Sequence, residues 1–317
     1  MRLALHFLAA YAAIVSACYV PFNNFRYINT TFFHQSMAAE LDSAPAKGWT
    51  TVLTGNSPLR PWPKVTESVS IHYCYWDRLS YNNLNVLVEA ANKMWRDKIE
   101  TLEISLDNDN EFPSYHSYTS TGYIPAEDDS APGRHRLSIY KPPNQNEDWY
   151  ILDIAHELGH VFGMVHEHQH FDRDLYVSFD CTKLEGYDKA KEALAEIPDS
   201  EEPPTTDQIC ASNWMGGHYV QWSAPHDFST DMGTTDDGRQ NPQEYSNAFD
   251  ASSIMIYPSW ARAAKPNGDV TQVPLVKWKG KAPAKGTKPN AGNAELVKDV
   301  HGISDLDQEF IKRTYPW

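Results

Sequence analysis

HELGHVFGMVHEH, residues His156 to His168, sets two histidines four positions apart and a third six positions later. On an α-helix, His156 and His160 lie one turn apart on the same face, so both imidazoles can bind one metal ion. Gly163 tolerates the positive φ that ends a helix, and a turn there can bring His166 back to the same ion. Three protein ligands leave one coordination position open, which is typical of a catalytic zinc ion. The stretch therefore predicts a site for one catalytic Zn²⁺.

Glu157 follows the first of these histidines directly. A carboxylate in this place points toward the mouth of the metal site and can act as general base on the attacking water. A bare H-E-x-x-H occurs by chance on helices that carry surface histidines. The extended pattern fixes three histidines, a glutamate and a glycine together, and it therefore favours a metal site over a surface helix.

The composition limits the class of protein. The 317 residues suffice for one large domain or for two lobes with a real core. Hydrophobic residues make up 41% and charged residues 22%, which excludes a disordered chain. The net charge of −15 argues against nucleic acid or an anionic membrane as a partner. We therefore expect a globular enzyme that acts on neither.

Residues 1–17 have the pattern of a secretory signal. Arg2 supplies a positive start, an apolar run follows over residues 3–15, and Ala17 is a small residue of the kind that precedes cleavage. The apolar run is too short to span a bilayer. The pattern predicts a secreted, extracellular protein with no membrane attachment after the signal is removed.

The rest of the chain divides by composition. Residues 18–60 show no sustained period and could be a propeptide, an N-terminal arm or part of the fold. The catalytic domain is expected over residues 61–317. Within it we expect an N-lobe over about 61–163 and a C-lobe over about 164–317.

Periodicity predicts an α/β arrangement before the metal motif. Apolar residues alternate over 69–76, 102–106 and 136–140, as in strands. Residues 79–98 repeat apolar side chains at three and four, as in an amphipathic helix whose buried face is Leu84, Leu87, Val88, Ala91 and Trp95. The strand at 136–140 is either an edge strand that an extended substrate can join or an interior strand.

The metal motif should lie on a helix that begins near residue 148 or 149 and ends at Gly163. Its apolar face, which should pack on the sheet, consists of Leu152, Ala155, Leu158 and Phe162. This packing would hold the ligand face in place.

The region after the motif is more irregular. A helical pattern covers 183–197, and Pro266 to Asp269 is a turn signal that predicts a hairpin ahead of the apolar run 273–276. A last helix is predicted over 304–315, with Ser304 as its N-cap and Asp307 three residues on.

The four cysteines are Cys18, Cys74, Cys181 and Cys210. Cys181 and Cys210 flank one segment and could bridge it, and export would make disulfides possible. Cys74 could pair with Cys18 or be a buried thiol. The sequence alone leaves three pairings open.

The chain resembles the astacin-type metalloproteases of the metzincin clan. The zinc motif is one reason, and its continuation is a second: His166-Glu167-His168-Gln169 leads into Asp172-Arg173-Asp174-Leu175-Tyr176-Val177. The third is Ser253-Ile254-Met255-Ile256-Tyr257, which is similar to the Met-turn of that family. His170 departs from the pattern, because many relatives have Arg there.

The resemblance implies a fold. It implies an α+β, metzincin-like zincin fold with an N-terminal α/β lobe that contains a mixed twisted sheet and two long helices. The C-terminal lobe would be irregular and end in a helix, and the active-site cleft would lie between the lobes.

The resemblance also implies roles by position. His156, His160 and His166 would bind the zinc ion. Glu157 would be the general base, and Tyr257 would help to stabilise the oxyanion. Met255 would form the floor beneath the metal, and Glu167 matches a glutamate that anchors the mature N-terminus.

Taken together, these patterns predict a secreted, zinc-dependent endopeptidase that hydrolyses peptide bonds of extracellular proteins through a zinc-bound water activated by Glu157. It would take extended polypeptides, act as a monomer and need no cofactor besides zinc. Two rivals are a non-catalytic binding module that kept the fold and a zinc hydrolase of a non-peptide bond. The complete catalytic set argues against the first, and the paired Met255 and Tyr257 argue against the second.

Overall fold

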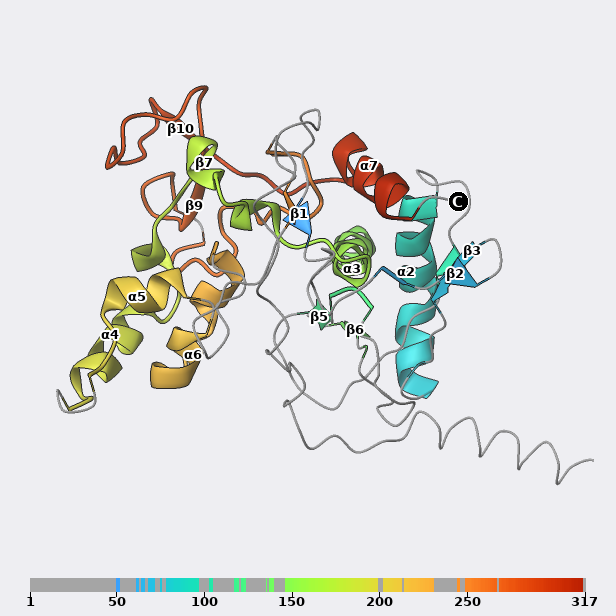
Figure 1. Ribbon diagram of the computed structural model, residues 1–317, viewed down its shortest axis with the longest axis horizontal. Helices are drawn as coiled ribbons and strands as arrows, with labels where there is room; N and C mark the ends of the chain where they lie inside the picture. The colour runs from blue at the N-terminus through green and yellow to red at the C-terminus, as the bar shows by residue number, and fades with distance from the viewer. Residues whose placement is uncertain are drawn as a thin grey trace, which may run out of the picture. The chain divides into compact units, whose positions relative to one another are not determined.

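A computed structural model describes most of the chain from residue 146 onward and shorter segments before it (Figure 1). The later described ranges are 146–198, 202–212, 214–230, 244–245, 249–266 and 268–315. The earlier ones are 50–51, 61–62, 64–65, 68–71, 75, 78–96, 103–104, 117–119, 121–123, 135 and 137–139. Cys18 and Cys74, like the predicted signal at 1–17, lie outside the described residues.

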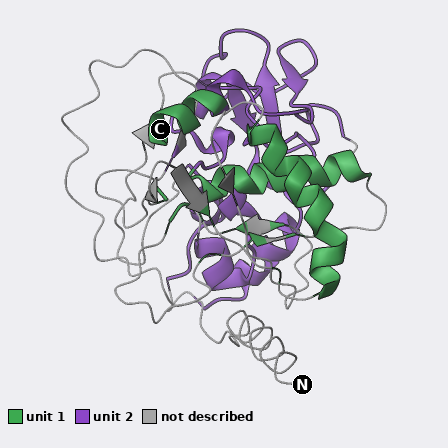
Figure 2. Ribbon diagram, turned by 90° about the vertical axis from the view of Figure 1, so that its right-hand side faces the viewer, with its two compact units in different colours: residues 1–31, 58–163, 308–317 green, residues 32–57, 164–307 purple. Residues whose placement is uncertain are grey.

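The chain divides into two compact units, coloured green and purple in Figure 2. The first holds the described parts of residues 58–163 and 308–317. The second holds those of residues 164–307, together with the short strand β1 (Thr50–Thr51).

Two helices, α2 (Arg78–Arg96) and α3 (Glu147–Val161), pack side by side in the first unit (Figure 1). The α2 residues that face the core are those that the apolar period predicted: Leu84, Leu87, Val88, Ala91 and Trp95 are all buried. The ring of Trp95 packs edge-on against Phe162, with 5.2 Å between ring centroids. The Tyr315 hydroxyl donates to the Phe162 carbonyl at 2.9 Å, so the closing helix is fastened to the end of α3.

The apolar face of α3 differs in one position from the predicted one. Ala155, Leu158 and Phe162 are buried as expected, but Leu152 is only partly buried and Ile154 is completely buried instead. The helix contacts both α2 and strand β5. Its buried face is therefore rotated about the helix axis relative to the face that would be buried if the helix packed only on a sheet.

The described strands of the first unit are short. Strand β3 (Ser68–Ile71) pairs antiparallel with β2 (Lys64–Val65) and parallel with β4 (Glu103–Ile104), so this sheet is mixed, as predicted. Strand β6 (Leu137–Ser138) pairs antiparallel with β5 (Tyr118–Thr119).

The second unit contains a three-stranded antiparallel sheet of order β10-β9-β7. Strand β9 (Leu275–Trp278) pairs with β7 (Val177–Phe179) and with β10 (Ala294–Leu296). The predicted hairpin at Pro266–Asp269 is therefore wrong: the strand that follows finds its partners elsewhere in the chain. A turn signal cannot by itself choose a partner when more distant strands pack better.

Part of the early segment belongs to the second unit. Strand β1 pairs antiparallel with β8 (Glu244–Tyr245), and Thr51 also forms a bridge with Met164. Thr50 and Thr51 thus pair with the second unit, and the assignment of residues 18–60 as propeptide, arm or part of the fold stays a prediction.

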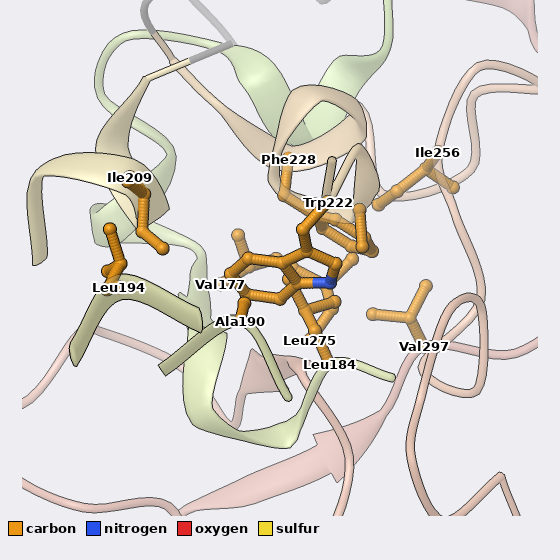
Figure 3. Close-up of a cluster of buried hydrophobic side chains, with 11 residues drawn as sticks. Val177, Leu184, Ala190, Leu194, Ile209, Trp222, Phe228, Ile256, Leu275 and Val297 are labelled. Atoms are coloured by element: carbon orange, nitrogen blue, oxygen red, sulfur yellow. The ribbon is translucent and has the colours of Figure 1, made fainter. Parts of the chain in front are cut away.

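Besides strands β7 and β9, three helices contribute side chains to the core of the second unit (Figure 3). They are α4 (Tyr187–Ala195), α5 (Thr206–Ala211) and α6 (Met215–Val220). The core consists of Val177, Leu184, Ala190, Leu194, Ile209, Trp222, Ala224, Phe228, Ile256, Leu275 and Val297. Cys181 and Cys210 form a disulfide with 5.9 Å between their Cα atoms, so the predicted bridge is confirmed.

Helix α7 (Asp305–Thr314) begins as predicted. The Ser304 hydroxyl accepts the Asp307 N–H at 2.9 Å, and the Asp307 carboxylate accepts the Ser304 N–H at 3.0 Å. Helices and small sheets thus occur together, and the predicted α+β class is confirmed. In the part of the chain that the structure describes, no helix is both long and apolar enough to cross a membrane.

Candidate metal centre

Helix α3 carries the first two histidines of the motif. Its first turn is capped by Asn146, whose side-chain oxygen accepts the Trp149 N–H at 2.8 Å. The helix ends at Val161, and Gly163 follows with φ of 96°, in the left-handed region that favours glycine. The turn predicted at Gly163 is therefore present.

Three contacts hold the ligand-bearing end of α3 in the first unit. Trp95 Nε1 donates to the Ala155 carbonyl at 3.0 Å, and Trp62 Nε1 donates to the Val161 carbonyl at 2.8 Å. The Gly122 N–H donates to the His160 carbonyl at 2.9 Å. These three hydrogen bonds hold the backbone of α3 in place. The backbone positions of His156 and His160 are therefore fixed.

The three predicted ligands come together. His156, His160 and His166 each offer a ring nitrogen, and these nitrogens lie within 4.8 Å of one another. The His156 and His160 rings are nearly perpendicular, at 89°, with centroids 4.9 Å apart. Three neutral imidazoles are a donor set that zinc prefers, and the separation suits a single ion. The residues therefore fit the metal that the sequence implied.

Glu157 lies between these ligands in the sequence and is 5% exposed. A carboxylate removed from bulk water interacts more strongly with nearby charge and with protons. This is the setting that a general base requires next to a metal.

A 3₁₀-helix, η2 (Glu167–Gln169), follows His166 directly, and all three of its side chains are buried. Gln169 Oε1 lies 3.0 Å from Nδ1 of His166, and Gln169 Nε2 donates to the His226 carbonyl at 3.1 Å. The ring of His168 stacks on that of His166 at 5.0 Å, with 18° between their planes. The third ligand is thus held by its own neighbours in the sequence.

Met255 and Tyr257 lie beside this turn. Met255 is completely buried, and its carbonyl accepts the Glu167 N–H at 3.0 Å. The ring of Tyr257 lies 4.3 Å from that of His166 between centroids, and its backbone N–H donates to Nδ1 of His168 at 3.2 Å. The predicted Met-turn (Ser253–Tyr257) and the predicted third ligand, His166, are therefore parts of one packed unit.

Glu167 contacts the same region through its side chain. Its Oε1 accepts the Asp250 N–H at 2.7 Å. Burial, with a smaller contribution from the nearby carboxylates of Asp250, Asp307 and Asp172, raises the pKa of Glu167 well above its ordinary value, although the hydrogen bond from Asp250 opposes this. Glu167 thus joins the end of the zinc motif to the segment that leads into the Met-turn.

Asp307 supports the Met-turn from the start of α7. Its carboxylate accepts the Ser253 hydroxyl at 2.6 Å and the Ile254 N–H at 2.9 Å, in addition to its bond with Ser304. Burial raises the pKa of Asp307 to about 6, against the opposing effect of these hydrogen bonds. The residue that was predicted as part of a helix cap therefore also shapes the Met-turn.

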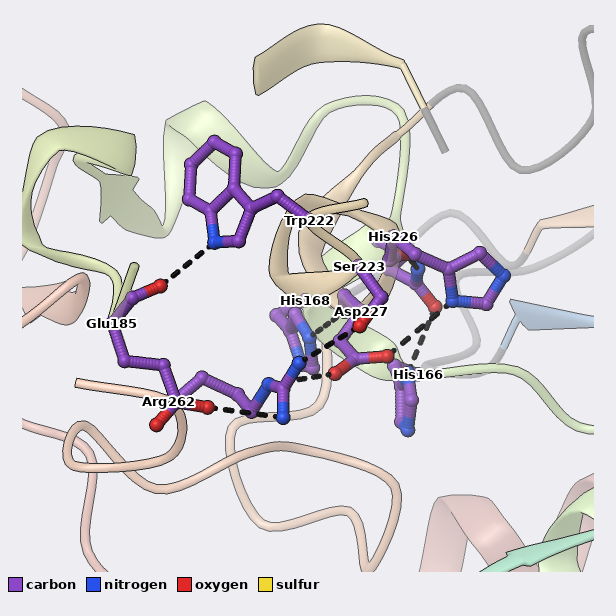
Figure 4. Close-up of polar contacts among 9 residues, drawn as sticks. His166, His168, Glu185, Trp222, Ser223, His226, Asp227 and Arg262 are labelled. Carbon is purple, nitrogen blue, oxygen red and sulfur yellow. Dashed lines mark hydrogen bonds and ion pairs between the residues drawn. The ribbon is translucent and has the colours of Figure 1, made fainter. Parts of the chain in front are cut away.

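Arg262 forms ion pairs beside the 3₁₀-helix η6 (Ala224–Phe228), as Figure 4 shows. Backbone carbonyls of η6 lie within hydrogen-bond distance of side chains of η2. Arg262 pairs with Asp227 at 3.3 Å and with Glu185 at 3.0 Å, and the Asp227 carbonyl lies 2.8 Å from Nε2 of His168. The loop η6 is thereby held from both sides.

Three residues support the metal centre in ways that the sequence did not predict. His168 and Gln169 were read as a continuation of the motif, and Asp307 only as a cap. Besides nearby contacts with His166 and Ser304, these residues have partners 50 or more residues away in the chain, in His226, Asp227, Ser253 and Tyr257. The one available signal was the polar run after His166, which is unusual for a segment this deeply buried.

The metal motif lies in a segment that matches a protein-family model. Residues 130–199 match the model described as Astacin (Peptidase family M12A). Among solved structures, the chain is similar to High choriolytic enzyme 1, a hatching enzyme zinc-protease from Oryzias latipes (medaka fish), with 15% identity over 80% of this chain and 92% of that chain and a TM-score of 0.44. It is also similar to myroilysin, with 16% identity over 84% of this chain and 98% of that chain and a TM-score of 0.42. No curated protein sequence matches the chain.

Proposed function

We propose that this chain, whose residues 130–199 match the Astacin (Peptidase family M12A) model, is a secreted zinc metalloendopeptidase that cleaves extended polypeptides. The observation that carries the proposal is the grouping of ring nitrogens from His156, His160 and His166 within 4.8 Å of one another. A helix that merely carried surface histidines would not gather a third one from beyond its own end.

The three histidines would hold one zinc ion. Zinc, when bound, lowers the pKa of a coordinated water toward about 7 and polarises a peptide carbonyl. Glu157 takes a proton from the attacking water while the water oxygen bonds to the carbonyl carbon. Glu157 then passes that proton to the amine that leaves when the C–N bond breaks. Its burial supports this role, because a carboxylate removed from bulk water interacts more strongly with nearby charge.

Tyr257 would donate its hydroxyl to the developing oxyanion. Two contacts support this role: its ring lies against His166, and its backbone is held by His168. Met255, which is completely buried next to Glu167, would provide the apolar floor.

Export agrees with two features. Residues 1–17 have the pattern of a cleaved signal, and the Cys181–Cys210 disulfide is of a kind that persists in oxidising compartments. The net charge of −15 argues against nucleic acid as a substrate. We propose that the enzyme works as a monomer.

The test compares the wild-type chain with Glu157→Gln and with Glu147→Gln, an exposed glutamate in the first turn of the same helix. We expect Glu157→Gln to fold and to bind Zn²⁺, but to lose about 10²- to 10⁴-fold in casein hydrolysis. Glu147→Gln should behave as wild type. Removal of the metal by a chelator should abolish hydrolysis, and added Zn²⁺ should restore it.

Two results would oppose the proposal. Full activity of Glu157→Gln would exclude the proposed general base. A wild-type chain that binds Zn²⁺ but hydrolyses no peptide bond would favour a binding module or a hydrolase of another bond.

A further inference from the structure

The side chain of Gln169 is completely buried, and its amide nitrogen and amide oxygen both have hydrogen-bond partners. Its amide nitrogen donates to the backbone carbonyl of His226 at 3.1 Å. Its amide oxygen lies 3.0 Å from Nδ1 of His166. The two partners have different chemistry, and this difference fixes the orientation of the amide.

A backbone carbonyl can only accept hydrogen bonds, so the atom of Gln169 that faces His226 must be the NH₂ group. The oxygen therefore faces His166 and can only accept. Nδ1 of His166 must then carry the hydrogen, which leaves the lone pair of the neutral ring on Nε2. This is the tautomer in which His166 can offer Nε2 to a metal ion.

The His226 carbonyl is itself held in position. Arg262 pairs with the Asp227 carboxylate at 3.3 Å, and the Ser229 N–H donates to the Pro225 carbonyl at 2.9 Å. The stacked ring of His168 covers one face of His166 and limits its rotation. The amide of Gln169 thus links a braced loop to the third histidine.

We propose that Gln169 is a positioning residue that fixes the tautomer and the ring orientation of His166 for metal binding. The proposal rests on the zinc function proposed above. Partners of this kind orient metal-binding histidines and raise their basicity, and their loss lowers metal affinity by about 10- to 100-fold.

The test measures Zn²⁺ affinity of the metal-free full chain by competition with a chromophoric chelator. Gln169→Met has a similar shape but offers Nδ1 only a weak thioether acceptor, and we expect its dissociation constant for Zn²⁺ to rise about 10- to 100-fold. Gln169→Glu keeps an oxygen for Nδ1 and should bind Zn²⁺ within about tenfold of wild type. Gln208→Met is the matched control, because Gln208 closes the capping box of α5 and contacts no residue of the metal motif.

A second readout follows the tautomer directly. Nitrogen NMR of the metal-free wild type should show His166 with its hydrogen on Nδ1, and Gln169→Met should show a mixture of tautomers. A change in fold stability alone would not alter this spectrum.

The outcomes are distinct. Unchanged affinity in Gln169→Met, equal losses in Gln169→Met and Gln208→Met, or a loss in Gln169→Glu as large as that in Gln169→Met would each overturn the role of Gln169. If Gln169→Met does not fold, the nitrogen NMR of the metal-free wild type decides, and a hydrogen on Nε2 of His166 would overturn the role of Gln169. A wild-type chain without Zn²⁺ affinity would instead overturn the proposed function.

Discussion

Tyr257 and His168 are joined by a hydrogen bond in which the backbone N–H of Tyr257 donates to Nδ1 of His168 at 3.2 Å. The other ring nitrogen, Nε2, lies 2.8 Å from the carbonyl oxygen of Asp227, so it must carry the hydrogen. His168 is therefore a neutral ring with both nitrogens in use, and it connects the Met-turn to the loop η6.

Replacement of His168 by Leu should impair turnover more than substrate binding. The change leaves the Tyr257 N–H and the Asp227 carbonyl without partners, at a cost of about 1–3 kcal/mol each in the free energy of unfolding. A displaced Tyr257 should lower kcat by about 10- to 100-fold, while KM changes little.

Kinetics on a peptide substrate measure this split. His168→Asn keeps an acceptor near the position of Nδ1 and should recover part of kcat. His226→Leu is the control, because the His226 side chain is 58% exposed and contacts the Asp227 side chain rather than His168. Equal kcat values in His168→Leu and wild type would contradict the prediction.

Replacement of Asp307 by Ala should destabilise the protein. The Ser253 hydroxyl and the N–H groups of Ile254 and Ser304 would each lose a buried acceptor. We expect a loss of about 3 kcal/mol in the free energy of unfolding, measured by urea titration. Asp305→Ala, an exposed neighbour on the same helix, should cost less than about 1 kcal/mol. Similar losses in both variants would show that Asp307 acts only through the helix terminus.

The carboxyl group of Asp153 should make the free energy of unfolding depend on pH. Burial raises its pKa from 3.8 to about 6, partly offset by a hydrogen bond from the Ser117 hydroxyl. Between these values the folded state binds more protons than the unfolded state, so this contribution to stability is complete below pH 3.8 and declines until about pH 6.

Asp153→Asn removes the ionisation and retains an oxygen for Ser117. The stability of the variant relative to wild type should therefore increase as the pH rises from about 4 to 6, by on the order of 2 kcal/mol, and then stay constant. Urea unfolding of the two proteins across this range measures the difference. A difference that does not vary with pH would argue against a raised pKa in the folded state.

Loss of the disulfide should lower stability without affecting the metal site. Cys181 and Cys210 are 29 residues apart in the sequence, and closing a loop of this size contributes about 3–4 kcal/mol in the chain-entropy model. The double replacement by Ser should lose this amount in urea unfolding. It should also become insensitive to reductant, whereas wild type should respond to reductant by a similar loss.

The sequence predicted the elements that depend on local spacing. The buried face of α2, the turn at Gly163, the cap from Ser304 and the Cys181–Cys210 pair all follow from short-range patterns or from residue chemistry. The grouping of the histidine ligands also follows, because the three lie within eleven residues of one another.

What the sequence did not reveal depends on distant partners. Strand β9 pairs with β7, about a hundred residues earlier, rather than with a neighbour across the 266–269 turn. Gln169 meets a carbonyl 57 residues away, and no period marks such a contact. The error at Leu152 arose because the helix packs against another helix, whose position the apolar pattern of α3 does not specify.

The supports of His166 bear on the order of events during folding. His156 and His160 need only their own helix, but the ring of His166 is held through Gln169 and η6, and the adjoining Met-turn is held by Asp307. Gln169 and His226 are 57 residues apart in the sequence, so the ring of His166 can be oriented only after this distant segment has folded against it. We therefore expect tight Zn²⁺ binding to appear late in folding, after the helix that carries the first two histidines has formed.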